Sequence, residues 1–150
     1  MKEKTLSKKE IKEINQKLNY NPEILNKKDN VKHYKNDLEY YKKDNEVILI
    51  KNKELIPSLK LLLKNNFLKK TTCDMGAVKF ICNGADIMRP GITELESFEK
   101  DEVITIVDEK NKTPLAVCKA LYNSEEIQEM KGGKALENLH YVGDEYWNIQ

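Results

Sequence analysis

The spacing of apolar residues in the first part of the chain is helical. Ile11, Ile14 and Leu18 recur along one face, with charged and amide side chains between them. Ser7 lies just before this run and Glu10 follows three residues later, which is the arrangement of a capping box. The pattern therefore predicts a helix that begins at Ser7 and ends at Leu18.

The apolar spacing shortens toward two between Val31 and Leu49. This alternation is typical of half-buried strands, so three short strands are expected here. Residues 43–45 contain Asp and Asn, which tolerate the left-handed backbone of a hairpin turn. Pro57 then suits the first turn of a second helix. The buried stripe expected on that helix consists of Leu59, Leu62 and Leu63.

A short helix is expected to follow Asp74. The Asp74 side chain can accept a hydrogen bond from a free backbone amide and so cap the helix. Ala77, Phe80 and Ile81 have the spacing that buries one helical face. Gly84 can close the helix, because glycine adopts the left-handed conformation at little cost.

A short strand over residues 85–88 is expected after this glycine. Pro90 ends the strand, because proline cannot donate a hydrogen bond to a neighbouring strand. Gly91 allows another backbone to approach closely, as the rim of a phosphate-binding site requires.

Strands dominate the expected remainder of the chain. They cover residues 103–107, 115–120, 141–142 and 146–149, and the last two form a hairpin. Short helices are expected to begin at Ser124, with Ile127 facing inward, and near Lys134.

Composition indicates a globular chain. With 150 residues, of which 39% are hydrophobic, the chain can bury one ordinary core or two small ones. The longest apolar runs, residues 47–50 and 61–63, are far shorter than the ~18 residues that a membrane-spanning helix needs. The first lysines precede a charged amphipathic segment instead of an apolar one, unlike a signal peptide. We therefore expect a cytoplasmic protein with no membrane partner.

Charge is distributed unevenly, although the net charge is only +1. Residues 1–72 hold 18 lysines and 10 acidic residues, whereas residues 73–150 hold seven lysines, one arginine and 15 acidic residues. A basic N-terminal half fits a phosphate backbone, and a lysine-rich solvated surface accounts for it equally well. Both interpretations stay open at the level of sequence.

No arrangement of reactive side chains indicates an active site. Cys73, Cys82 and Cys118 form no CxxC pair, so neither disulfides nor a zinc site is favoured. Cys82 and Cys118 are expected in the core, and Cys73 is interpreted as a chance neighbour of the helix cap. His33 and His140 have no nearby pattern of a triad or metal site, and a structural role is expected for His140. We expect no catalytic residue, no metal and no cofactor.

Three sets of residues resemble the motifs of one known family. The first set consists of Asp74, Gly76-Ala77, Gly84 and Pro90-Gly91-Ile92, and it resembles the opening motif of the PUA domain, a small RNA-binding pseudo-barrel. The second consists of Lys131-Gly132, Ala135, Asn138-Leu139-His140-Tyr141, Asp144 and Tyr146-Trp147. It resembles the closing motif of the malignant T-cell-amplified sequence proteins, one branch of the PUA proteins. The third, from Pro57 to Leu62 with Phe67, resembles the helix that precedes the PUA domain in that branch.

This resemblance implies an α+β protein with two domains. A small pre-PUA domain of helices and strands would cover residues 1–70, and a PUA β-pseudobarrel would cover residues 71–150. The function it implies is a non-catalytic RNA-binding protein of translation. Such a protein binds the small ribosomal subunit or the acceptor end of tRNA in initiation, re-initiation or recycling. A monomer is expected, with a protein partner related to the density-regulated protein on the first domain.

Eight residues are expected to contact RNA, because they lie at elements that line the groove of the PUA domain in the family. They are Lys79, Met88, Arg89, Pro90, Gly91, Lys119, Lys131 and Lys134. Arg89 has the strongest independent argument, because it is the only arginine beside 25 lysines. Its planar fork can bind phosphate through two hydrogen bonds or stack on a base, which lysine cannot do.

The alternative function is an accessory RNA-binding subunit of an enzyme that modifies tRNA or rRNA. PUA domains also guide pseudouridine synthases and archaeosine transglycosylases to their RNA. Those enzymes carry large catalytic domains, and roughly 70 residues before the PUA segment cannot hold one.

Overall fold

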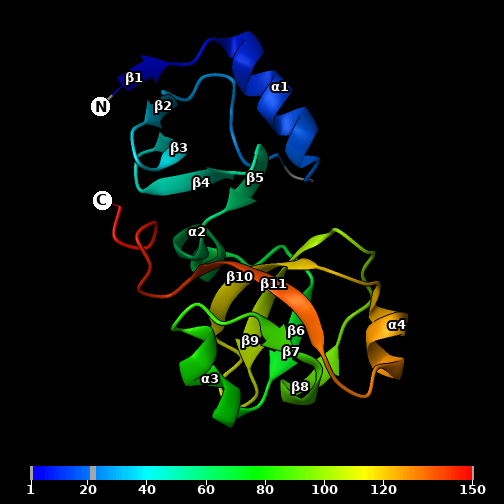
Figure 1. Ribbon diagram of the computed structural model, residues 1–150. Helices are drawn as coiled ribbons and strands as arrows, with labels where there is room; N and C mark the ends of the chain where they lie inside the picture. Colours follow the sequence, from blue (N-terminus) through cyan, green and yellow to red (C-terminus); the bar gives the residue numbers. More distant parts are fainter. Residues whose placement is uncertain (1, 21–22, 150) are drawn as a thin grey trace. The chain divides into compact units, whose positions relative to one another are not determined.

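The computed structural model describes residues 2–20 and 23–149, and it forms two compact units (Figure 1). The first unit ends at Pro57, and the second comprises Ser58–Ile149. The sequence-based division after residue 70 differs from this one. Helix α2 (Leu59–Lys64) packs on strand β10 of the second unit, so it belongs with the residues that follow it.

An antiparallel sheet and one helix form the first unit (Figure 1). The elements are β1 (Lys2–Thr5), α1 (Lys8–Leu18), β2 (Lys32–Lys35), β3 (Glu39–Lys43), β4 (Glu46–Lys51) and β5 (Glu54–Pro57). The strands lie in chain order across the sheet. The predicted strands between residues 31 and 49 are confirmed as β2, β3 and β4.

The predicted first helix is also confirmed. Ser7 caps α1 through a capping box with Glu10, and Asn19 ends the helix with a φ of 54°. Ile11 and Ile14 are buried against Ile48 of β4. Strand β1 was not predicted from the sequence, because all four of its residues are exposed and no apolar alternation marks it.

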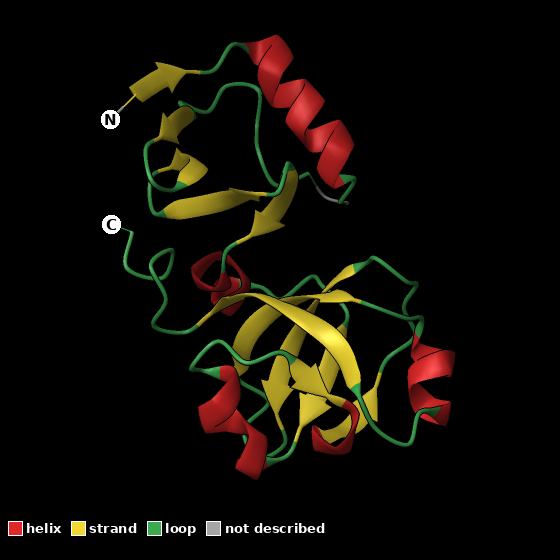
Figure 2. Ribbon diagram, in the orientation of Figure 1, coloured by secondary structure: helices red, strands yellow, loops and turns green. Residues whose placement is uncertain are grey.

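A curled six-stranded sheet with helices at its margins forms the second unit (Figure 2). After α2 come β6 (Lys70–Cys73), α3 (Met75–Ile81), β7 (Ile87–Met88), the 3₁₀ turn η1 (Arg89–Gly91), β8 (Ile92–Leu95), β9 (Val103–Asp108), β10 (Pro114–Ala120), α4 (Ser124–Glu129) and β11 (Lys134–Tyr141). The strand order is β7-β11-β10-β9-β6-β8, in which β6 and β9 run parallel and the other pairs antiparallel. The expected α+β class with a C-terminal half-barrel is confirmed.

Two details of α2 differ from the expectation. Pro57 is the last residue of β5, and Ser58 caps the helix by accepting a hydrogen bond from the Leu61 amide. The buried leucines include Leu61, whereas Leu63 is 48% exposed. A helix of six residues has room for only a narrow buried stripe, so the third leucine of the predicted stripe faces out.

The end of the chain was predicted wrongly. Lys134 begins the long strand β11 and no helix, because Gly133, with a φ of 88°, turns the chain into pairing with β7 and β10. Residues 142–149 form turns instead of the predicted hairpin. The expected strand at 141–142 is thus the end of β11, and 146–149 contains no strand.

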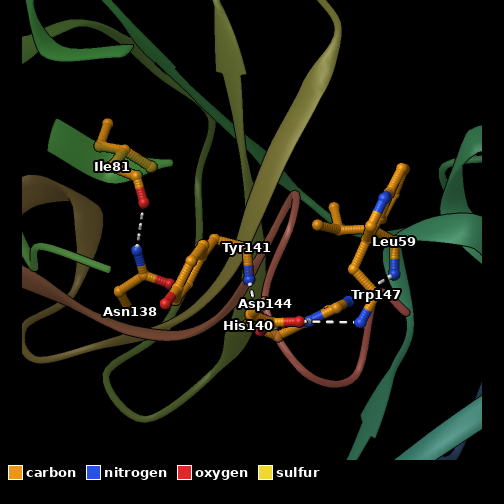
Figure 3. A network of polar contacts seen from close by, with 7 residues as sticks. All are labelled: Leu59, Ile81, Asn138, His140, Tyr141, Asp144 and Trp147. Carbon is orange, nitrogen blue, oxygen red and sulfur yellow. Dashed lines mark hydrogen bonds and ion pairs between the residues drawn. The ribbon is translucent and has the colours of Figure 1, made fainter. Parts of the chain in front are cut away.

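A buried polar network fixes these C-terminal turns (Figure 3). His140 is fully buried, and its Nε2 accepts a hydrogen bond of 3.1 Å from the Leu59 amide at the start of α2. Its Nδ1 lies 2.9 Å from the Asp144 carboxylate, which also accepts hydrogen bonds from the amides of Tyr141 and Trp147. Burial raises the pKa of Asp144, but the hydrogen bonds from the His140 ring and from these two amides lower it below its usual value overall. The expected structural role of His140 is consistent with this geometry.

Candidate nucleic-acid interface

Helix α3 and the turn η1 meet at a close backbone contact. Asp74 caps α3 by accepting a 2.8 Å hydrogen bond from the Ala77 amide, as predicted. The Asp74 amide in turn donates a 2.9 Å hydrogen bond to the Gly91 carbonyl. A Cβ atom on Gly91 would lie 3.3 Å from the Cβ of Ala77. The absence of a side chain at Gly91 therefore allows α3 to lie against η1.

Gly84 ends the segment that follows α3 and directs the chain into β7. It has a φ of 95°, and the amides of Gly84 and Ala85 donate to the carbonyls of Ile81 and Phe80, which is the bonding of a Schellman motif. Asn138 of β11 donates from its side chain to the carbonyl of Ile81 (Figure 3) and to that of Ala85. The predicted left-handed glycine is confirmed, and β11 holds the turn in place.

Phe80 faces solvent, contrary to the expectation that it lies on the buried face of α3. Its exposed fraction is 59%, whereas Ile81 is buried and Val78 packs against the core in its place. Val78 thus takes the inward position expected for Phe80, although the spacing of Ala77, Phe80 and Ile81 fits one helical face. The position of Phe80 creates an exposed aromatic ring at the edge of this surface.

An apolar pocket of about 330 Å³ opens beside Phe80. Its lining comes from α3, the Gly84 turn, β7 and η1, and consists of Ala77, Phe80, Ile81, Ala85, Asp86, Ile87, Met88 and Gly91. Met88 at the opposite rim is 49% exposed. Exposed apolar groups that converge on a pocket are typical of a binding site.

Cationic side chains flank this pocket. Lys134 at the start of β11 lies opposite Met88 and forms a 2.9 Å ion pair with Asp86. This hydrogen bond raises the pKa of Lys134, and the pKa of Asp86 is lowered because the Asn138 amide and Lys134 outweigh its burial. Lys79 is exposed, and its Nζ lies 5.3 Å from the centroid of the Phe80 ring. Both lysines therefore carry positive charge next to apolar surface.

Arg89 is partly anchored to its own backbone. The amide of Arg89 donates to the Gly133 carbonyl, and its Nη1 donates a 3.2 Å hydrogen bond to the Ile92 carbonyl. Its Nε is buried and has no hydrogen-bond partner among the described residues. Because the Nε is buried, a ligand cannot reach it unless the Arg89 side chain moves.

The eight residues expected to contact RNA fall into two groups. Met88, Arg89, Pro90, Gly91, Lys79 and Lys134 come together around the pocket or on the elements that line it. Lys131 is exposed in the glycine-containing loop before β11. Lys119 lies on β10, in register with Val103 and Glu137, and does not line the pocket.

Sequence reasoning missed the contributions of Phe80 and Asp86. No local signal in the sequence marked Phe80 as exposed, because Ala77, Phe80 and Ile81 have the spacing of one helical face. Asp86 likewise had no signal, because its partners Lys134 and Asn138 come from β11.

The three thiols of the second unit are buried or partly buried. Cys73 and Cys118 are fully buried, so the interpretation of Cys73 as a chance neighbour of the cap is wrong. Burial, with nearby carboxylates adding to it, raises the pKa of Cys73 to about 11, and burial also raises the pKa of Cys82 and Cys118. Residues 2–20 and 23–149 contain no cluster of His, Cys, Asp or Glu able to hold a metal ion, and no helix among them is long and apolar enough to cross a membrane.

Comparison with known proteins assigns the chain to a family. The model of the PUA domain matches residues 69–142. A solved protein of Pyrococcus horikoshii superposes with a TM-score of 0.84 at 30% identity, over 97% of this chain and 98% of that one. A PUA-domain protein of Thermoplasma acidophilum gives a TM-score of 0.78, also at 30% identity, over 97% of both chains. The fold is that of a PUA-domain protein, and the chain belongs to this family.

Sequence relatives define the branch. An uncharacterised protein of Methanocaldococcus jannaschii is 43% identical over 97% of this chain and 94% of its own length. Translation machinery-associated protein 20 of Saccharomyces cerevisiae is 36% identical over 66% of this chain, and malignant T-cell-amplified sequence 1 of Danio rerio is 35% identical over 63%. The chain spans 59% and 55% of the length of these last two relatives. The chain therefore has relatives in the malignant T-cell-amplified sequence branch, as the sequence motifs implied, and an archaeal relative over nearly its whole length.

Proposed function

We propose that this chain is a non-catalytic protein of translation that binds the unpaired acceptor end of tRNA and the small ribosomal subunit. The observation that carries the proposal is the apolar pocket beside Phe80 and Met88, with Lys79 and Lys134 at its margins. A base stacks or inserts where apolar groups converge, and phosphates pair with the neighbouring lysines. The relatives named as translation proteins supply the cellular process, and a cytoplasmic location follows from that process.

Double-stranded RNA would gain little binding energy from such a pocket, because its bases are already paired and stacked. An unpaired end can place a base in the pocket and still lay its backbone along the lysines. Arg89 would contribute through its planar guanidinium group, and Lys131 through the exposed loop before β11. Lys119 is the member of the expected set that receives least support, since it lies outside the lining.

The test is a titration of the full chain with tRNA whose unpaired 3′ nucleotides are intact or removed. We expect removal to weaken binding about tenfold, in line with ~1–3 kcal/mol per stacked base, and binding to weaken steeply as salt rises. Phe80→Ser should reproduce this loss. Tyr122→Ser is the matched control, because Tyr122 is 41% exposed but does not line the pocket. Equal affinity for both tRNAs would contradict the use of the pocket.

The protein partner expected on the first domain, a factor related to the density-regulated protein, remains part of this proposal. The resemblance to the branch supports it, since those proteins use their first domain for partner binding. Capture of such a factor by the full chain, abolished by substitutions in residues 2–57 and retained with Phe80→Ser, is the expected result. Loss of capture with Phe80→Ser instead would indicate that the partner binds the second unit.

A second candidate function is that of an accessory subunit for RNA modification. It is favoured by a fold match to a solved H/ACA ribonucleoprotein bound to a substrate RNA, with a TM-score of 0.50 at 26% identity over 63% of this chain. Sedimentation of the tagged full chain from a lysate separates the two functions. Migration with small ribosomal subunits supports translation, and migration with a modification enzyme supports the second candidate.

A further inference from the structure

Strand β8 forms an edge of the six-stranded sheet, with β6 as its one neighbour. The Glu96 amide donates a 3.2 Å hydrogen bond to the Lys70 carbonyl, so the backbone of Glu96 is directed toward β6. Leu95 is the preceding residue and lies opposite Thr71. Successive residues of a strand direct their backbone groups to opposite sides, so the amide and carbonyl of Leu95 point away from β6. They are available to an added strand.

Two open hollows continue from this edge across helix α4. The first has a volume of about 610 Å³ and lies between the end of β8 and α4, and the second, of about 430 Å³, extends to Met130. Four glutamates line them, and no lysine, arginine or histidine among the residues that the structure describes does so. The surface beside the free edge is therefore acidic.

Two of these four glutamates already have partners within the protein. Glu96 accepts a 2.6 Å hydrogen bond from a backbone amide of β6, and Glu126 accepts one in the capping box of α4. Glu125 and Glu129 are exposed and line both hollows. No hydrogen bond or ion pair with another described residue engages either of them. These two carboxylates are free to meet a ligand.

The positions of Glu125 and Glu129 are unfavourable for the helix itself. They are four residues apart, so they lie on one face of α4, where like charges repel. Glu129 is also the last residue of the helix, at the negative end of its dipole, and the last turn contains no basic residue. A cationic group between the two would relieve both effects. Met130 beside them offers apolar surface to the aliphatic stem of a lysine or arginine.

We propose that the free edge of β8 and the glutamates of α4 form a docking site for an extended, lysine- or arginine-rich segment of another protein. The segment pairs with the backbone of Leu95 and places a basic side chain between Glu125 and Glu129. Charge complementarity favours this occupant, because residues 73–150 hold 15 acidic residues against eight basic ones. RNA is disfavoured here, since its phosphates would meet the glutamates. The site shares no lining residue with the pocket beside Phe80 and goes beyond the proposed function.

The test measures binding of the full chain to a labelled eight-residue peptide in which lysine and valine alternate. Glu125→Gln with Glu129→Gln should weaken binding about fivefold, the effect of losing two exposed ion pairs. The matched control is Glu13→Gln with Glu145→Gln, which removes the same charge at two exposed positions outside both hollows. Equal weakening by the two pairs of substitutions, or no weakening by the first, overturns the proposal.

Strand pairing needs a readout of its own, which requires no change to the protein. A peptide of alternating lysine and proline keeps the charge but cannot complete a strand ladder, because proline has no amide hydrogen. The lysine–valine peptide should slow hydrogen exchange at the Leu95 amide of the full chain, and the lysine–proline peptide should not. Exchange at Leu95 that is unchanged by the first peptide would refute pairing with β8.

The other possible occupants of this face are outcomes of the same set of measurements. Self-association of the chain that Glu125→Gln with Glu129→Gln abolishes would assign the face to a second copy. Saturable binding of Mg²⁺ alone that the same substitutions abolish would assign it to a metal ion. Binding of tRNA should be equal in this variant and in the parent, and its loss would place RNA on the face. Each of these three results overturns the proposal, and the first two leave the proposed function intact.

Discussion

The two ends of strand β11 differ in how their polar groups are satisfied. At its C-terminal end, His140 is buried and bonded on both ring nitrogens, to the Leu59 amide and to Asp144. At its N-terminal end, Lys134 is exposed beside a pocket with Met88 at its rim, and Arg89 leaves a buried donor unsatisfied. One end is complete within the protein, and the other holds residues for which we propose RNA contacts. On this proposal, a family motif that spans both ends combines residues that fold the domain with residues that bind.

The largest effect is expected at the complete end. His140→Phe keeps much of the ring volume but removes both hydrogen bonds, which leaves the Leu59 amide and the Asp144 carboxylate without their partner. We expect the free energy of unfolding to fall by about 2–4 kcal/mol, because two buried polar groups lose a bond. Denaturant unfolding measures the change. RNA affinity of the folded fraction should be unchanged, and a selective loss of RNA binding would break the distinction between the two ends.

The next largest effect is expected at Gly84, which lies against Tyr141 at the C-terminal end of β11. The backbone φ at Gly84 is 95°, which strains any residue with a side chain, and an added Cβ atom would lie 3.2 Å from the Tyr141 ring. Gly143 has a φ of 93° but no atom within 4 Å of such a Cβ, so it isolates the backbone strain. Gly143→Ala should cost about 1 kcal/mol, and Gly84→Ala about 2 kcal/mol or more, since the ring must also move. Thermal melts of both variants test this, and equal melting temperatures would show that the Tyr141 ring moves aside at no cost in stability.

The open end is tested by Arg89→Lys. This change keeps the charge but removes the planar fork and the Nε donor, so RNA affinity should fall by about 1–2 kcal/mol. Unfolding should change little, because the lost contact is one hydrogen bond to the Ile92 carbonyl. Lys100→Arg is a suitable control at an exposed position outside the pocket. If Arg89→Lys binds acceptor-stem RNA as tightly as the parent, Arg89 contributes only a positive charge, and the contact lies with the lysines.

The smallest effect is expected in the pH dependence of folding. The folded-state pKa of Asp144 is lowered, so its contribution to stability is present above its unfolded pKa of about 4 and is lost as pH falls toward the folded value. Asp144→Asn removes this contribution. Its unfolding midpoint should therefore fall less steeply than that of the parent below pH 4. Parallel acid titrations of the two proteins would contradict a role of His140 in holding the carboxylate charged.

Features with a local cause could be predicted from the sequence. The caps at Ser7 and Asp74 and the left-handed Gly84 depend on residues within a few positions, and all three have the predicted geometry. The three strands predicted between residues 31 and 49 also formed, although β4 buries the consecutive Val47, Ile48 and Leu49 instead of alternate residues. The family resemblance added the half-barrel and the approximate place of the groove, since its motifs record these same turns and caps.

Features that depend on distant partners were decided only by the tertiary structure. The His140 ring reaches the Leu59 amide from the other end of the second unit's chain, and no spacing in the sequence indicates such a contact. Phe80 is exposed and Cys73 is buried because of the way the rest of the second unit packs around each of them. Residues 134–141 form one strand because β7 and β10 supply its hydrogen bonds on both sides. The sequence thus determined the local turns and the family, while packing between remote segments decided which side chains became core and which remained to meet a ligand.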